Sequence, residues 1–238
     1  MNIAACLLLT LAPSPWAVGP ALSLTTLGPV PKSVVRVYLV RHGQAVSNLE
    51  PTPNLPPDKL DHLTDRGRAQ ARSAGAALRG LDVALVLSSP AGRARETAEE
   101  IRAALGAPAV KVDPRIRPIE LGRGPGGKPL TWNDRGAEWK AGRDPVPEGG
   151  ESMEQMGRRV LDLVRAEAKE RPGGSVVLVA HGEVIAAFVG LVQKTPPAKR
   201  YPPTAPNGSV TVVEAGVVTP PSLLLSDFVP AETEVHKR

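Results

Sequence analysis

The chain has little of what several classes of protein depend on. It holds one cysteine, Cys6, among 238 residues, so no intrachain disulfide can form. Aromatic residues make up 3% of the sequence, which leaves few rings on which nucleic-acid bases could stack. The apolar run from Ile3 to Ala12 is too short to cross a bilayer as an ordinary helix. These shortages argue against a disulfide scaffold, a nucleic-acid-binding protein and a stable membrane association.

What is present suits a globular protein with a small anionic ligand. Hydrophobic residues make up 42% and charged residues 22% of the chain, an ordinary globular balance. The formal net charge is +5, and its Lys and Arg residues are spread along the chain rather than gathered in one basic stretch. A mildly basic surface of this kind attracts anions.

The first 31 residues are predicted to be a leader or a disordered extension. Lys32 is the first charged side chain, and the apolar run before it has the length of a signal-peptide core but no basic residue ahead of it. The segment is interpreted either as a secretory or organellar targeting signal or as an uncleaved tail of a cytoplasmic protein.

The remaining chain alternates strand and helix patterns. Short apolar, β-branched runs predict strands over 34–40, 83–87, 110–112, 176–180 and 210–213. Helices are predicted over 65–79 with Thr64 as N-cap, 92–105 closed by Gly106, 152–171 and 183–192.

This alternation predicts an α/β fold, a three-layer αβα sandwich with a mainly parallel central sheet. We expect a single domain over 32–216, an irregular, Gly- and Pro-rich excursion over 114–150, and a C-terminal tail over 217–238. The sequence leaves the oligomeric state open.

Three predicted strands end in polar residues. Arg41-His42-Gly43, Ser88-Ser89-Pro90 and His181-Gly182 each follow a buried-type strand. Ligands of open α/β sheets bind outside the carboxyl ends of the strands, so we expect these ends to form the site. A metal site is the weaker interpretation, because no carboxylate or cysteine cluster accompanies the two histidines.

A phosphoryl-transfer site explains the set better. Imidazole is abundant in its neutral, nucleophilic form near pH 7. A phosphohistidine would split hydrolysis into two displacements. Arginine suits phosphoryl oxygens because its planar fork is always charged, and Arg41 and Arg93 are the candidates. This chemistry needs neither a cofactor nor a metal.

The same residues carry a resemblance to a known family. Arg41-His42-Gly43-Gln44, followed by Asn48, resembles the hallmark of the histidine phosphatase superfamily, phosphoglycerate mutase-like branch. Four further pieces match in the family's order: Leu63 to Ala71, Ser88 to Ala98, Pro147 to Ser152, and Val179 to Gly182. Together the five pieces are a specific signal and lie within residues 34–215.

The resemblance implies a role for each matching residue. His42 is the nucleophile, and Arg41, Arg93 and His181 bind the phosphoryl group, with His181 also stabilising the transition state. Asn48 is a further phosphate contact. Arg95 competes with Arg93 as the phosphate arginine, but the family's spacing favours Arg93.

The general acid is the point at which the chain departs from the family. A leaving alkoxide needs a proton, which this branch usually takes from a glutamate four residues before a glycine. That position here holds Pro118, which cannot donate a proton. Glu120, two residues downstream, and Glu183, two residues after His181, are the alternatives.

The predicted function is hydrolysis of a small phosphorylated metabolite, a phosphomonoester, through phosphorylated His42. Two alternatives stay open. One is a phosphoglycerate mutase-type phosphotransferase, which the short excursion over 114–150 disfavours. The other is a phosphate-binding pseudoenzyme, an interpretation that the proline at position 118 supports.

Overall fold

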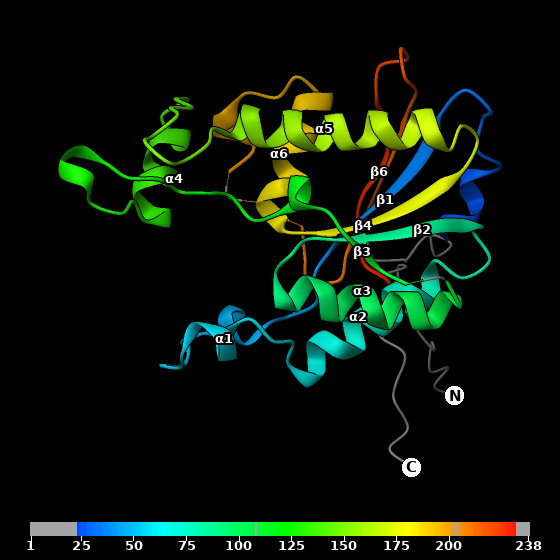
Figure 1. The fold of residues 1–238 in the computed structure, drawn as a ribbon, viewed down its shortest axis with the longest axis horizontal. Coiled ribbons are helices and arrows are strands. Elements are labelled where there is room, and N and C mark those ends of the chain that lie inside the picture. The colour runs from blue at the N-terminus through cyan, green and yellow to red at the C-terminus, as the bar shows by residue number, and fades with distance from the viewer. Residues whose placement is uncertain (1–22, 108, 202, 204, 232–238) are drawn as a thin grey trace, which may run out of the picture.

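The protein forms a six-stranded sheet with helices on both faces (Figure 1). The structure is a computed structural model that describes residues 23–107, 109–201, 203 and 205–231. The sheet order is β3-β2-β4-β1-β5-β6, with β1 to β4 parallel and β5 antiparallel to both β1 and β6. The predicted three-layer α/β fold with a mainly parallel sheet is therefore confirmed.

Most elements lie where the sequence pattern places them. The strands are β1 (Val35–Arg41), β2 (Val83–Ser88), β3 (Lys111–Val112), β4 (Ser175–Ala180), β5 (Val210–Ala215) and β6 (Ser222–Phe228). The helices are α1 (Pro57–Leu60), α2 (Asp65–Ala77), α3 (Gly92–Leu105), α4 (Trp132–Lys140), α5 (Met153–Glu170) and α6 (Gly182–Val192). Short 3-10 turns are η1 (Leu24–Leu27), η2 (Val46–Asn48), η3 (Pro114–Ile116), η4 (Pro125–Gly127) and η5 (Pro197–Lys199).

The alternation of side chains along the central strands builds two cores. In β1, Val37 and Leu39 face the core under α5 and α6, whereas Tyr38 and Val40 face the core under α2 and α3. Because both faces are covered, β1 and β4 are buried along nearly their whole length, and their residues are mostly apolar, as expected for a buried parallel strand. Figure 1 shows the two helix pairs on opposite sides of the sheet.

Local signals fix the helix ends that position the site. Thr64 caps α2 by accepting a hydrogen bond from the Gly67 N–H at 3.0 Å, a contact worth about 1 kcal/mol in helix N-caps. Gly106 ends α3 in the left-handed conformation, at φ 63°.

Three elements, α1, α4 and β6, were not expected from the sequence, and both predicted domain limits also differ from the structure. The excursion over 114–150 contains α4, which a capping box between Thr131 and Asp134 starts. β6 pairs with β5, so the sheet continues past residue 216, where the domain was predicted to end. Before Lys32, Leu24 is buried and Arg36 donates to the Gly28 carbonyl oxygen, so the packed structure begins earlier than expected.

Most of the predicted leader, residues 1–22, lies outside the described residues. Within the part of the chain that the structure describes, no helix is long and apolar enough to span a membrane.

Candidate active site

The carboxyl ends of β1, β2 and β4 meet at one edge of the sheet. The His42 N–H donates to the Ala180 carbonyl oxygen at 3.0 Å, and the Ser89 N–H donates to the Val179 carbonyl oxygen at 3.0 Å. These ladder bonds place His42, Ser89 and His181 directly after three neighbouring strands. The predicted meeting of the polar strand ends is what the structure shows.

His42 is buried, with 3% of its surface exposed, and both ring nitrogens have partners. Its Nδ1 lies 2.8 Å from the Gly43 carbonyl oxygen, and its Nε2 lies 3.1 Å from Nε of Arg93. A guanidinium only donates, so this pattern assigns the proton to Nδ1 and the lone pair to Nε2. Burial first, and then the Arg93 charge, lower the pKa of His42 to about 3. The ring is therefore neutral at physiological pH.

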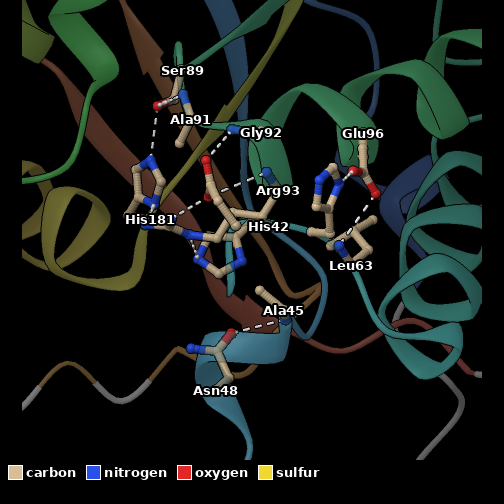
Figure 2. A network of polar contacts seen from close by, with 12 residues as sticks. His42, Ala45, Asn48, Leu63, Ser89, Ala91, Gly92, Arg93, Glu96 and His181 are labelled. Atoms are coloured by element: carbon tan, nitrogen blue, oxygen red, sulfur yellow. Dashed lines mark hydrogen bonds and ion pairs between the residues drawn. The ribbon is translucent and has the colours of Figure 1, made fainter. Parts of the chain in front are cut away.

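His181 lies beside His42, with their ring centroids 5.1 Å apart. Its Nδ1 accepts from Nη2 of Arg93 at 3.1 Å, and its Nε2 donates to the Ser89 hydroxyl oxygen at 2.8 Å. Burial, followed by the charges around it, lowers the pKa of His181 well below its ordinary value. Figure 2 shows one guanidinium reaching both imidazoles.

Residues that do not belong to the strand ends hold the side chains of Arg93 and Arg41 in place. Nη1 of Arg93 donates to a carboxylate oxygen of Asp61 at 2.5 Å, and the other oxygen accepts the Gly92 N–H at 2.6 Å. Nη1 of Arg41 donates to the Ala205 carbonyl oxygen at 2.5 Å. The buried Nε of Arg41 has no hydrogen-bond partner in the described structure. A buried donor of this kind suits an anion entering the site.

Two glycines set the path of the loop after His42. A Cβ atom on Gly43 would lie 2.2 Å from the Gly67 carbonyl oxygen, and one on Gly67 would lie 2.0 Å from the Gln44 carbonyl oxygen. The main chains of the two segments therefore cross in direct contact. The Gly43 N–H also donates to the buried hydroxyl of Thr97 at 3.0 Å, so Thr97 supports the loop as well as packing within α3.

A cavity of about 500 Å³ opens over the strand ends. It is lined by most of the residues predicted for the site, namely Arg41, His42, Asn48, Arg93, His181 and Glu183. Arg95 is exposed on α3 and lies outside it.

The two candidates for the general acid occupy different environments. Glu183 is buried and lines the cavity. Burial raises its pKa, although backbone hydrogen bonds and the charges of Arg93 and Arg41 act in the opposite direction. Glu120 does not line the cavity, and its exposed carboxylate pairs with Nε of Arg117 at 3.0 Å, which lowers its pKa. The structure therefore brings Glu183, and not Glu120, to the cavity that His42 and His181 line.

Two polar residues at the site, Asp61 and Asn207, were not found from the sequence, whereas Ser89 was expected there as part of a strand end. Asp61 holds Arg93, Ser89 holds His181, and Asn207 donates from Nδ2 to the His42 carbonyl oxygen at 3.0 Å. Asn48 reaches the cavity from η2, where its Oδ1 accepts the Ala45 N–H at 3.0 Å. Among the described residues, no group of three or more His, Cys, Asp or Glu side chains could hold a metal ion.

Comparison with known proteins places this chain in a family. The sequence profile of the histidine phosphatase superfamily (branch 1) matches residues 37–223. A probable phosphoglycerate mutase GpmB from Erwinia tasmaniensis is 31% identical over 168 residues, which cover 68% of this chain and 77% of the relative.

Solved structures with a similar level of sequence identity to this chain have the same fold. A mycobacterial glucosyl-3-phosphoglycerate phosphatase superimposes with a TM-score of 0.62 at 28% identity, covering 80% of this chain and 97% of the other. Bacillus stearothermophilus YhfR superimposes with a TM-score of 0.64 at 26% identity, covering 81% and 96%.

Proposed function

Because the chain belongs to the histidine phosphatase superfamily (branch 1), we propose that it is a phosphomonoesterase that works through a phosphohistidine on His42. The observation that carries this proposal is the state of the His42 ring. Its Nε2 lone pair faces the cavity's arginine, while its Nδ1–H is fixed on the Gly43 carbonyl oxygen. A neutral imidazole held in this tautomer is a nucleophile that needs no prior deprotonation.

The phosphoryl group would be bound by the groups that now contact one another. Nε and Nη2 of Arg93 point at the two imidazoles, where the oxygens of a phosphoryl group between them would accept their hydrogen bonds. Arg41 adds its unpartnered Nε, and Asn48 lies on the same cavity wall. The dianion would raise the pKa of His181, so that this residue donates to the transition state.

Glu183 is the proposed general acid. Nε2 of His42 attacks phosphorus, the P–O bond to the alcohol breaks, and the Glu183 proton passes to the leaving oxygen. The Glu183 carboxylate then takes a proton from the water that attacks the phosphohistidine. The N–P bond breaks, inorganic phosphate leaves, and both residues return to their starting states. A carboxyl group whose pKa is raised by burial suits the first of these steps.

Hydrolysis is favoured over the two alternatives by what lines the cavity. A phosphoglycerate mutase must hold a carboxylate and a second phosphoryl position, yet the only cationic side chains among the described lining residues are Arg41 and Arg93. A binding protein without a general acid is disfavoured because Glu183 lines the same cavity as Pro118, the residue that stands at the family's acid position.

Trapping the phosphoenzyme tests the proposal. The full chain is mixed with p-nitrophenyl phosphate, quenched in alkali, in which phosphohistidine survives, and analysed by peptide mass spectrometry. We expect one phosphoryl group on the His42 peptide, and neither label nor turnover in His42→Ala. His62→Ala is the control, because that side chain is 54% exposed and does not line the cavity. Turnover that persists in His42→Ala would refute the mechanism.

A further inference from the structure

The cavity is larger than a phosphoryl group needs. Its volume of about 500 Å³ falls in the range that holds a drug-sized ligand. The polar groups assigned to phosphoryl binding account for only part of its lining. Most of the rest is apolar or aromatic, and is made by Pro118, Ile119, Leu121, Trp132, Tyr201 and Pro203. We call these six residues the apolar wall.

The apolar wall gathers aromatic residues in a chain that has few of them. The sequence holds three Trp, two Tyr and two Phe. Trp132 and Tyr201 belong to the wall, and Trp139 lies between them, with ring centroids 6.4 Å from Trp132 and 5.1 Å from Tyr201. Trp139 is fully buried, whereas Trp132 is 43% exposed. A large exposed ring at a cavity is surface that a ligand can cover.

The wall is built by close packing between distant segments. A Cβ atom on Gly136 would lie 2.7 Å from the Tyr201 ring, so only a glycine in α4 allows the ring to pack there. The Trp139 indole N–H donates to Asp144 at 3.1 Å, and the Arg135 guanidinium lies 4.9 Å from the Trp139 ring centroid. These contacts fix Tyr201 and the neighbouring Trp139 ring before any ligand arrives.

Charge at the cavity disfavours a second anionic group on the substrate. Arg41 and Arg93 are its only cationic side chains among the described lining residues, and both serve the phosphoryl group. Arg117 pairs with Glu120 and Glu151 instead, and Lys140, 5.9 Å from the Tyr201 ring centroid, does not line the cavity. A carboxylate in the leaving group would meet apolar surface and the carboxyl group of Glu183.

We infer that the substrate is a phosphomonoester whose leaving group is an uncharged alcohol with a flat apolar face, such as an aromatic alcohol. The inference rests on the proposed phosphatase function and adds the substrate class to it. The phosphoryl group binds at Arg41, Arg93 and His181, and the alcohol lies against Trp132 and Tyr201.

Three esters with alkoxide leaving groups test the inference, because each makes the same demand on the general acid. These are benzyl phosphate, glycerol 3-phosphate and 3-phosphoglycerate. We expect kcat/KM for benzyl phosphate to exceed that for glycerol 3-phosphate by about tenfold, within the range that apolar pockets supply. We expect 3-phosphoglycerate to be the poorest substrate. The Trp132→Ala variant should lose most of the preference for the benzyl ester, and Trp132→Phe should restore it.

The outcomes separate this inference from the proposed function. Hydrolysis of all three esters with 3-phosphoglycerate preferred, or with a preference that Trp132→Ala leaves unchanged, would overturn the substrate class and leave the phosphatase standing. No hydrolysis and no phosphohistidine would overturn both. Calorimetric titration of His42→Ala, which should not turn over its ligand, gives a readout that does not depend on catalysis. Benzyl phosphate binding no tighter than 3-phosphoglycerate would also overturn the substrate class.

Discussion

Acidification is expected to unfold this protein partly through His42. Burial and two neighbouring guanidinium groups hold the pKa of His42 at about 3, against 6.5 for an ordinary histidine. Below about pH 6.5 the unfolded chain therefore binds a proton at this residue that the native protein does not. The unfolded state binds more protons, so the free energy of unfolding falls as the pH falls from about 6.5 toward the folded pKa.

The size of the effect follows from the two pKa values. One pKa unit corresponds to about 1.4 kcal/mol, and about pH 5 lies roughly 1.5 units below the ordinary pKa of histidine. The native pKa is lower still, so His42 alone should reduce the free energy of unfolding by about 2 kcal/mol between about pH 7.5 and about pH 5. His181 acts in the same direction, because burial lowers its pKa as well.

Urea unfolding of the wild type and of His42→Asn at the two pH values measures this contribution. Asparagine does not titrate, so the variant should lose about 2 kcal/mol less than the wild type over the same interval. The comparison uses differences between pH values, and a constant change in stability caused by the substitution cancels. Equal losses in the two proteins would show that the His42 pKa is not lowered and would remove the basis for a neutral nucleophile.

Three further outcomes are expected at the site. Glu183→Gln should lower kcat for alkyl phosphates by about 10²–10⁴-fold and should lower kcat for p-nitrophenyl phosphate far less. Glu120→Gln should leave kcat for both kinds of ester unchanged. Equal losses of kcat on both esters in Glu183→Gln would exclude Glu183 as the general acid. Gly43→Ala should reduce the free energy of unfolding, measured in a urea titration, by about 3 kcal/mol, because the added Cβ atom would lie 2.2 Å from the Gly67 carbonyl oxygen. A variant as stable as the wild type would contradict the direct contact between these two main-chain segments. Asp61→Asn should lower kcat/KM about tenfold by loosening Arg93, and unchanged kinetics would show that the ion pair does not position the guanidinium.

The sequence predicted the parts of the fold that local chemistry decides. The run over 34–40 is β-branched and apolar, and it forms β1 because a strand covered on both faces needs such residues. Thr64 and Gly106 mark helix ends through hydrogen bonds and backbone conformations that depend on nearby residues alone. The meeting of His42 and His181 followed from parallel strand order, which the alternating pattern already indicated.

The elements that were missed depend on distant partners. α4 contains a glycine and only two large apolar residues, and its packing relies on Tyr201 from another part of the chain. The capping box of Thr131 and Asp134 was the local signal that could have revealed it. β6 forms through pairing with β5, and no periodic pattern within the tail itself predicted this strand.

The choice between the two glutamates could not be made from the sequence for a similar reason. Glu120 and Glu183 both lie near predicted site segments, and their distances along the chain do not show which side chain enters the cavity. The ion pair between Glu120 and Arg117 turns one carboxylate outward, and the packing of α6 buries the other. Asp61 and Asn207 were missed because each contacts its partner across a long stretch of chain.

The crossing at Gly43 and Gly67 bears on how this protein could be redesigned. With no side chain between the two main chains, residues 41–44 and 64–67 form one closely packed seat for His42, in which an added atom would displace that residue. The apolar wall comes instead from other segments of the chain, namely Pro118, Ile119, Leu121, Trp132, Tyr201 and Pro203. A mutant library that varies the wall and spares the seat should therefore change the leaving-group preference proposed above without disturbing the position of His42.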